Sequence, residues 1–389
     1  MINQEDYGYV LPENNLALSP AVPRDSSKLF IYNTLTDQIS FDHFYNIDKY
    51  LPKNSFIILN NTKVIPARVS MKKASGGKIV VLFLVNELKG MSYGLLGSLV
   101  RVMTDRKINV GEKLYFESGD SADVISQKEH FFELRYLFSR EKLFELLQIY
   151  GSMPIPPYLK KSPLKRDELL EKYQTIFARA PKSTLQECTL ASVAAPTASL
   201  HFTRRVMDKL DKIGIEKFFI TLHVGLGTFA PITEANIKSK KLHEEYYEID
   251  DSAFQLINRL KKDGRKLIAV GTTVVRTLES IARQRVFSST SPQWGPKSLT
   301  QKQLPSLGKT DLFIFPPHDF NMVDIMVTNF HLPKSSLMML VEAFLQFKGA
   351  TQPSPRLRRA KKRSLVELYN VAIKNNFRFY SFGDVMLIL

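Results

Sequence analysis

Residues 266–285 read KLIAVGTTVVRTLESIARQR, and this stretch decides the expected fold. The mainly apolar run Lys266–Val270 is followed by Gly271–Thr273, which suits a turn and a helix cap, and then by a helical pattern over Val274–Arg285. Another apolar run, Phe218–Val224, is continuous, as strands buried in a parallel sheet are. Strand, turn and helix in this order predict an α/β sheet with helices packed on it.

The chain changes character between residues 67 and 150. Short apolar runs alternate there with glycines at roughly 8–12-residue spacing, which is typical of a small β-barrel or a sandwich. Three prolines, Pro154, Pro156 and Pro157, mark the end of this region. The sequence therefore predicts a discontinuous α/β domain, 1–66 plus 151–389, that carries an inserted domain at 67–150.

Several local elements also follow from the pattern. Thr203 is suited to cap a helix that Gly214 ends. The remaining expectations are a helical stretch at Phe41–Leu51, strands at Asp311–Phe315 and Val323–Val327, and a helix at Ser335–Phe347.

Charge and cysteine content limit the function classes. The 389 residues include 54 Lys and Arg against 38 Asp and Glu, which gives a formal net charge of +16. This excess favours a nucleic acid as partner. The alternative is that all proteins of the source organism are basic, and we weigh it lower. The single cysteine, Cys188, excludes an intramolecular disulfide and a Cys-based zinc or iron–sulfur site. A basic stretch over 356–363 either binds phosphates or is a solvated surface tail.

No membrane segment is expected. The apolar run Leu337–Leu345 is interrupted by Glu342 and is far shorter than the ~18–20 residues of a membrane span. The chain opens with Glu5 and Asp6 instead of a basic and then apolar signal peptide. We therefore expect a cytoplasmic protein.

Polar residues follow the strands expected from Phe218 onward. Ligands of open α/β sheets bind outside the carboxyl ends of the strands, and helix N-termini there favour anions, so these residues are expected to meet in one crevice. They are His223, Gly225 and Gly227 after the first strand, Thr272, Thr273 and Arg276 after the second, His318 after the third, and Asn329, His331 and Lys334 after the fourth.

Other motifs carry weaker signals. Gly225-x-Gly227, with Glu244 and Glu245 about 20 residues further on, is either half of a dinucleotide-binding fingerprint or a tight turn. The histidines show no metal-binding spacing, so we expect no metal. A lone histidine is often structural, but His201, His223 and His331 occupy loops where an imidazole can move a proton. The small residues of 194–201 allow either close approach to a ligand or a packed turn.

Five long motifs make the chain recognisable. They are VAAPTASLHFT at 193–203, TLHVGLGTF at 221–229, AVGTTVVRTLE at 269–279, TNFHLPKS at 328–335 and FRFYSFGD at 377–384. Together with NNTKVIPAR at 60–68 and PIPPY at 154–158, they resemble the S-adenosylmethionine:tRNA ribosyltransferase-isomerase family of queuosine biosynthesis. The resemblance extends over nearly the whole chain.

The resemblance implies a fold and a reaction. The fold is a Rossmann-like layered α/β domain with an inserted small β-barrel domain. The enzymes transfer and isomerise the ribosyl group of S-adenosylmethionine onto the aminomethyl group of a 7-deazaguanine at the tRNA wobble position, which leaves epoxyqueuosine and releases adenine and methionine. S-adenosylmethionine is thus a co-substrate, with no permanently bound cofactor and no metal. The partner is the anticodon region of tRNA, and a monomer is expected over an oligomer.

The motifs also suggest site residues. His201, His223 and His331 are the candidates for acid and base. Glu244, Asp324 and Asp384 are candidates to face the sulfonium or the ribose, while Arg276 and Lys334 are candidates to bind the methionyl carboxylate or an RNA phosphate. The expected substrate-binding set is completed by Thr197, Ser199, Gly225, Gly227, Thr272, Thr273 and Asn329.

The sequence departs from the family pattern at three places. The family commonly has glycine where Ser192 and Ser199 stand, and Pro-Gly-Tyr where Pro316-Pro317-His318 stands. These departures leave open a non-catalytic RNA-binding relative as the alternative. A weaker alternative, built on Gly225-x-Gly227, is a Rossmann-type enzyme that uses NAD or S-adenosylmethionine.

Overall fold

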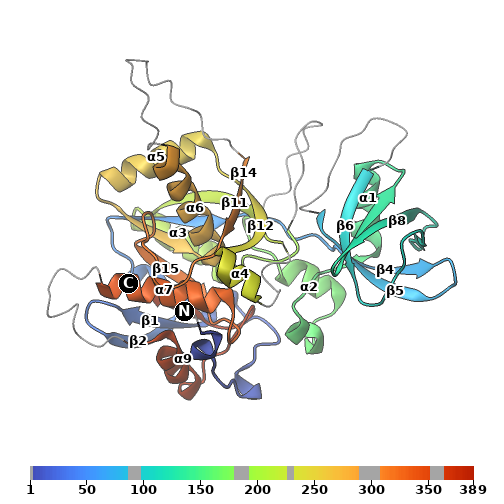
Figure 1. Cartoon of the computed structure of the whole chain (residues 1–389). Helices are drawn as coiled ribbons and strands as arrows, with labels where there is room; N and C mark the ends of the chain where they lie inside the picture. The colour runs from blue at the N-terminus through green and yellow to red at the C-terminus, as the bar shows by residue number, and fades with distance from the viewer. Residues whose placement is uncertain (1–2, 86–97, 179–191, 226–231, 289–306, 351–362) are drawn as a thin grey trace, which may run out of the picture.

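The computed structural model describes residues 3–85, 98–178, 192–225, 232–288, 307–350 and 363–389. Two sheets organise these residues (Figure 1). One has nine strands and is mixed; the other is antiparallel, and six of its seven strands close into a barrel. The expected fold class, a layered α/β unit together with a small β-barrel, is confirmed.

The nine-stranded sheet is parallel at its centre. Strand β3 (Ser55–Asn60) lies between β11 (Glu216–His223) and β13 (Lys266–Val270), and β15 (Ile325–Asn329) follows β13. All four run in the same direction. Their outer neighbours are β12 (Lys241–Glu248) and β14 (Leu307–Leu312) beside β11, and β16 (Val385–Ile388), β1 (Lys28–Asn33) and β2 (Gln38–His43) beside β15.

Helices cover both faces of this sheet. All six residues of β3 are buried, and alternate side chains enter two different cores, with Phe56 and Ile58 on one face and Ile57 and Leu59 on the other. The first face packs against α5 (Asp251–Lys262), α6 (Thr272–Ser288), α7 (Ser336–Ala350) and α9 (Leu365–Lys374). The second packs against α3 (Arg204–Lys212) and the 3₁₀ helix η4 (Phe44–Lys49). The layers are therefore helix, sheet and helix.

The barrel has a core of its own and lies to one side of the large sheet (Figure 1). Its strands are β4 (Arg68–Lys73), β5 (Lys78–Phe83), β6 (Ser98–Thr104), β7 (Lys113–Tyr115), β8 (Ser121–Lys128) and β9 (Phe131–Tyr136). Helix α1 (Arg140–Tyr150) then leads to β10 (Gly151–Ser152), which pairs with β4. The division into 1–66 plus 151–389 and an inserted 67–150 domain stays a proposal, which this separate core supports.

Short elements complete the described chain. They are α2 (Arg166–Lys172), α4 (Glu234–Ser239) and the 3₁₀ helices η1 (Gln4–Tyr7), η2 (Glu13–Asn15), η3 (Arg24–Ser26), η6 (Pro157–Lys161) and η7 (Thr197–His201). Within the described ranges, no helix combines the length and the apolar composition that crossing a membrane requires.

Three of the local expectations need correction. The stretch Phe41–Leu51 is not one helix, because its first residues belong to β2, where Phe41 pairs with Phe30 of β1. The strand expected at Asp311–Phe315 lies earlier, at Leu307–Leu312, where pairing with β12 fixes it. The strand expected at Val323–Val327 lies later, at Ile325–Asn329, where it pairs with β13 and β16. In all three cases tertiary pairing decides the boundary. The cap at Thr203 is confirmed, since its hydroxyl accepts a hydrogen bond from Val206 N.

Gly151 offers a test of the junction between the barrel and the large sheet. A Cβ atom on Gly151 would lie 1.8 Å from Pro66 O and 2.3 Å from Leu147 O, both backbone atoms. Gly151→Ala is therefore expected to lower the free energy of unfolding by about 3 kcal/mol, the upper end of overpacking penalties. The control is Gly77→Ala in the barrel, where the nearest atom is 3.9 Å away. Equal urea midpoints for the two variants would contradict this packing.

Candidate active site

A pocket opens at the carboxyl ends of β13 and β15. Its empty volume, open mouth included, is about 760 Å³. After β13, Gly271, Thr272 and Thr273 line it; from β15 onward, Asn329 and His331 do so. The turn after β13 is tied to β15, because Gly271 N donates to Val327 O at 2.8 Å. The pocket thus lies at the sheet edge where ligands of α/β proteins bind.

The start of η7 forms a second wall. Thr197 and Ala198 line the pocket there. The Thr197 hydroxyl donates to Asn329 Oδ1 at 2.9 Å, and Asn329 Nδ2 donates to Tyr380 O at 3.3 Å. Asn329 therefore joins three segments of the pocket that are distant in sequence. Its amide is fixed at both ends, which fixes the shape of the pocket.

The third wall is aromatic. Tyr158 of η6 and Tyr380 both line the pocket, and their ring centroids lie 4.8 Å apart. The hydroxyls of Tyr158 and Ser381 share a hydrogen bond of 2.6 Å. Tyr173 and Phe330 complete this wall. Aromatic faces of this kind stack on flat rings, nucleobases included.

His331 is the histidine that lines the pocket. Its Nε2 lies 2.8 Å from the Thr328 hydroxyl. Its backbone is held on both sides, since His331 N donates to the Tyr369 hydroxyl and His331 O accepts from the Tyr9 hydroxyl. Burial lowers the pKa of His331 to about 3. The imidazole is therefore neutral at physiological pH, where it can accept a proton but has none to give as an imidazolium.

The structure brings together five of the residues that sequence analysis singles out. They are Thr197, Thr272, Thr273, Asn329 and His331. Thr272 and Thr273 begin α6, whose N-terminus carries a partial positive charge, and Asn60 Nδ2 donates to the Thr273 hydroxyl at 3.4 Å. The expected convergence at the carboxyl edge thus holds for the turns after β13 and β15.

A second group of the expected residues lies beside the pocket without lining it. Arg276 is buried and pairs with Glu245 at 2.6 Å, while the other Glu245 oxygen accepts from Gly225 N at 3.0 Å. The neighbouring Glu244 is exposed and pairs with Lys309, because successive residues of β12 point to opposite faces. The buried partner of Arg276 is thus Glu245, and not the expected site residue Glu244. Gly227 lies outside the described residues.

His223 has buried surroundings of its own at the end of β11. Its Nδ1 lies 3.5 Å from the Thr62 hydroxyl, and its Nε2 lies 3.9 Å from a carboxylate oxygen of Glu248. Its neighbour Val224 lines the pocket, but His223 is not among the residues that do so. His318, after β14, is half-buried, and desolvation lowers its pKa.

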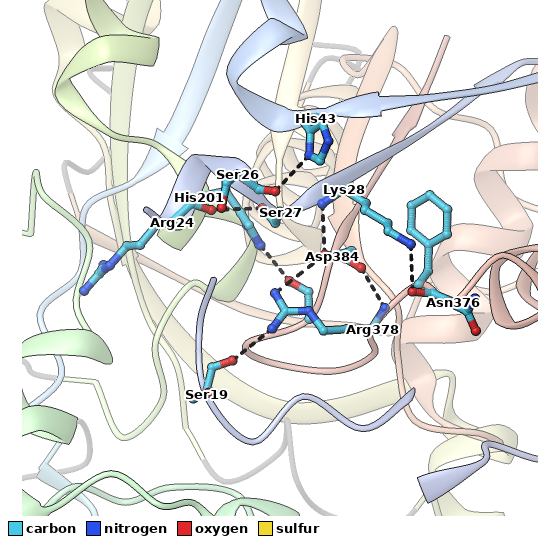
Figure 2. A network of polar contacts seen from close by, with 12 residues as sticks. Ser19, Arg24, Ser26, Ser27, Lys28, His43, His201, Asn376, Arg378 and Asp384 are labelled. Carbon is cyan, nitrogen blue, oxygen red and sulfur yellow. Dashed lines mark hydrogen bonds and ion pairs between the residues drawn. The ribbon is translucent and has the colours of Figure 1, made fainter. Parts of the chain in front are cut away.

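His201 and Asp384 belong to a buried polar network that fixes the chain (Figure 2). The His201 ring lies between Ala198 O, 3.1 Å from Nδ1, and Gly383 O, 2.8 Å from Nε2, and desolvation lowers its pKa. Asp384 accepts hydrogen bonds from Lys28 N at 2.9 Å and Arg378 N at 2.7 Å. Neither residue lines the pocket, so their contacts indicate structural roles.

Asp324 and Lys334 are also engaged elsewhere. Asp324 precedes β15 and accepts from Leu267 N at 2.8 Å, which puts it at the amino ends of the strands, opposite the pocket. It also pairs with Lys261. Lys334 is held by Glu5 at 2.6 Å. Of the basic stretch 356–363, the structure describes only Arg363, which pairs with Asp37.

The aromatic wall is what sequence analysis misses. Tyr158 and Tyr380 lie in two of the quoted motifs, PIPPY and FRFYSFGD, but neither follows a strand of the central sheet. The available signal was the motif itself, since nothing in the local pattern indicates that residues 158 and 380 meet. Among the described residues, no cluster of three or more His, Cys, Asp or Glu side chains is arranged to hold a metal ion.

Comparison with known proteins identifies the family. The family described as Queuosine biosynthesis protein matches residues 4–388. The chain belongs to this queuosine biosynthesis family. A relative from Carboxydothermus hydrogenoformans is 38% identical over 387 residues, 99% of each chain, and one from Halothermothrix orenii is 38% identical over 390 residues, again 99% of each. Both are named S-adenosylmethionine:tRNA ribosyltransferase-isomerase.

One solved structure also aligns with the chain. It is the S-adenosylmethionine tRNA ribosyltransferase of Thermotoga maritima, 28% identical, with 99% of this chain and 100% of that chain covered and a TM-score of 0.49. The family match over residues 4–388, together with the two relatives at 38% identity, confirms the resemblance seen in the motifs at the level of the family.

The two serines that sequence analysis expects to depart from the family pattern, Ser192 and Ser199, differ in their surroundings. The Ser192 hydroxyl donates to Ala194 O at 2.7 Å and accepts from Val224 N at 3.0 Å, and both of those residues line the pocket. The Ser199 hydroxyl is buried with no hydrogen-bond partner among the described residues. The Ser192 hydroxyl is therefore held by backbone groups of Ala194 and Val224, whereas Ser199 buries an unsatisfied hydroxyl.

This difference predicts opposite effects of two alanine variants. Ser192→Ala is expected to lower the free energy of unfolding by about 1–2 kcal/mol, because Val224 N loses its partner. Ser199→Ala is expected to leave it unchanged or raise it by about 1 kcal/mol, because an unsatisfied hydroxyl is removed. Urea unfolding of both proteins measures this. If Ser199→Ala destabilises the protein as much as Ser192→Ala does, the Ser199 hydroxyl is not an unsatisfied group.

Proposed function

We propose that this chain transfers and isomerises the ribosyl group of S-adenosylmethionine onto the 7-aminomethyl-7-deazaguanine wobble base of tRNA. Epoxyqueuosine remains in the tRNA, and adenine and methionine leave. The shared name of relatives that match over 99% of both chains supports this proposal. The observation that carries it is the composition of the pocket, which sets an aromatic wall for flat rings opposite hydroxyl, amide and imidazole groups.

The pocket suits the chemistry of this reaction. A sulfonium acidifies the C–H groups beside it, so a neutral imidazole near it can accept a proton. His331 is neutral there, since burial lowers its pKa to about 3, and because so low a pKa makes it a weak base, it is proposed for its place in the pocket and not for its basicity. The N-terminus of α6 at Thr272 and Thr273 provides a positive potential for the methionyl carboxylate. His331 is accordingly proposed as the proton acceptor, and the protonation of leaving adenine requires another donor.

The proposed partner is the anticodon region of tRNA, and the proposed compartment is the cytoplasm, where tRNA is modified. The proposed working unit is a monomer. The net charge of +16 supports a polyanionic partner. A wobble base that enters the pocket must leave its stack, and the tyrosine wall offers replacement stacking.

One assay tests this function. The protein is mixed with S-adenosylmethionine and an anticodon stem-loop that carries the aminomethyl-deazaguanine, and free adenine and RNA mass are followed together. Adenine release matched by an RNA mass gain of the ribosyl-derived group is expected. Tight RNA binding without adenine release would instead favour a non-catalytic relative. Binding of NAD without binding of S-adenosylmethionine would overturn the proposal altogether.

The role of His331 makes a kinetic prediction. His331→Gln is expected to lower kcat by about 100-fold or more, the range for loss of a proton-transfer group, while the Kd for the stem-loop changes little. The control is His130→Gln, at an exposed position of the barrel. Adenine release under saturating substrates measures kcat. Unchanged turnover in His331→Gln would remove this histidine from the chemistry.

The pH dependence adds a second readout for the same variant. Because the pKa of His331 lies near 3, its ring stays neutral throughout the neutral range. The ratio of wild-type to His331→Gln rates is therefore expected to be constant between about pH 6 and 8, well above that pKa. A ratio that grows as pH rises through 6.5 would show a histidine of ordinary pKa instead.

The RNA partner makes a prediction about salt. In a 3₁₀ helix, residues three apart lie on one face, so the exposed Lys161 of η6 lies on the same face as Tyr158, which lines the pocket. Lys161→Ala is expected to weaken stem-loop binding and to reduce the salt dependence of log K by about 0.7, one phosphate contact on a single strand. The control, Lys262→Ala, changes an exposed lysine at the end of α5, beyond the amino end of β13. Identical slopes for both variants would exclude the contact.

A further inference from the structure

Tyr380 has an unusual backbone conformation. Its φ angle is +73°, in the left-handed region that favours glycine. Bulky side chains are rarely found there, because the Cβ atom crowds the backbone. Such strain persists only where the surroundings hold the residue, and it concentrates at functional sites. A glycine would adopt this turn without strain, so the tyrosine side chain needs a reason for its presence.

The backbone around Tyr380 is held from several sides. Tyr380 N donates to Phe330 O at 3.1 Å, and Tyr380 O accepts from Gly383 N at 3.0 Å and from the Asn329 amide. These bonds fix the strained residue to the end of β15. The turn is therefore set in place before any ligand arrives.

The network of Figure 2 closes the same turn at its base. Asp384 accepts from Arg378 N at 2.7 Å, and Asp384 N donates to Arg378 O at 2.8 Å. His201 adds a contact to Gly383 O at 2.8 Å. The buried polar groups that do not line the pocket thus hold the loop 378–384, which carries two pocket residues, Tyr380 and Ser381.

The Tyr380 ring forms part of the pocket wall. It is half-buried and packs on Tyr158 with an interplanar angle of 50°. Because the two centroids are only 4.8 Å apart, no flat ring fits between them. A ligand ring can therefore stack only on the side of Tyr380 that the pocket leaves open. Stacking on such a face tolerates any base and is worth about 5- to 150-fold in affinity.

We propose that Tyr380 is a binding residue that stacks on a purine-type ring in the pocket, and that the loop 378–384 is held in a strained turn to present it. This inference rests on the proposed function, which supplies two such rings: the adenine of S-adenosylmethionine and the deazaguanine of the RNA. The stacking chemistry is the same for both. The experiment has a separate arm for each ring.

The test compares four variants by binding and by thermal unfolding. Tyr380→Phe keeps the ring and is expected to bind like the wild type. Tyr380→Ala and Tyr380→Gly are expected to bind S-adenosylmethionine or the stem-loop at least 10-fold more weakly, and equally so. The glycine variant is expected to unfold at a higher temperature than the alanine variant, because only alanine retains the strain. Lys240→Gly, which relieves a φ of +55° at an exposed helix end, is the control that leaves both affinities unchanged.

Each outcome decides the matter. Weaker binding of S-adenosylmethionine alone identifies adenine as the stacked ring, and weaker binding of the stem-loop alone identifies the RNA base; either supports the proposal. If the wild type releases adenine, and the folded Tyr380→Ala and Tyr380→Gly variants bind both ligands as tightly as the wild type does, the stacking role of Tyr380 is overturned. If the wild type binds neither ligand, the proposed function fails and the stacking role falls with it.

Discussion

The parallel pairing of β13 with β15 is the constraint on which the site depends. Ile268 pairs with Ile325 and Val270 with Val327, so the two strands end at the same edge of the sheet. The turns that follow must then begin side by side. Gly271, with a φ of +89°, makes the first of these turns tight enough for α6 to start at Thr272. The pocket is a consequence of the sheet, and Asn329 extends it to η7 and to the loop 378–384.

The sequence was sufficient to predict a site at the carboxyl ends of these strands, because strands, turns and helix caps leave local patterns. The bounds of β13 follow from a short apolar run, and the cap at Thr203 follows from one hydroxyl in front of a helical stretch. The start of β15 was harder. The expected strand began at Val323, whereas pairing begins at Ile325, and the difference leaves Asp324 at the amino end, where it binds Leu267 N. Local pattern cannot fix a boundary that a neighbouring strand decides.

The contacts of His201 and Asp384 could not be predicted, because they are made over long separations in the sequence. His201 meets Gly383, and Asp384 meets Lys28. A buried carboxylate or imidazole is stable only with hydrogen-bond partners, and backbone groups supply them here. Residue type alone does not distinguish such a structural group from a reacting one. The aromatic wall was missed for the same reason, since Tyr158 and Tyr380 are brought together only by the fold.

Structural and chemical roles are therefore divided between two layers of polar residues. The inner layer, with His201, Asp384 and Arg378, holds the loop 378–384, and the outer layer, with Thr197, Asn329 and His331, faces the pocket. The hydrogen bond from Asn329 to Tyr380 O connects the layers. The strain at Tyr380 requires this support, whereas the lowered pKa of His331 results from burial. The strained turn in the loop 378–384 thus lowers the stability of the fold, and in return the pocket wall is kept in place.

The location of S-adenosylmethionine tests the central claim most directly. A crystal structure of the complex would show which edge and which wall the ligand occupies. The account predicts density for the ligand within the pocket, between the α6 start at Thr272 and the tyrosine wall at Tyr380, with His331 beside it. Density at the Gly225–Glu245 end of β11, or beside Asp324 at the amino ends of the strands, with the pocket unchanged, would contradict it.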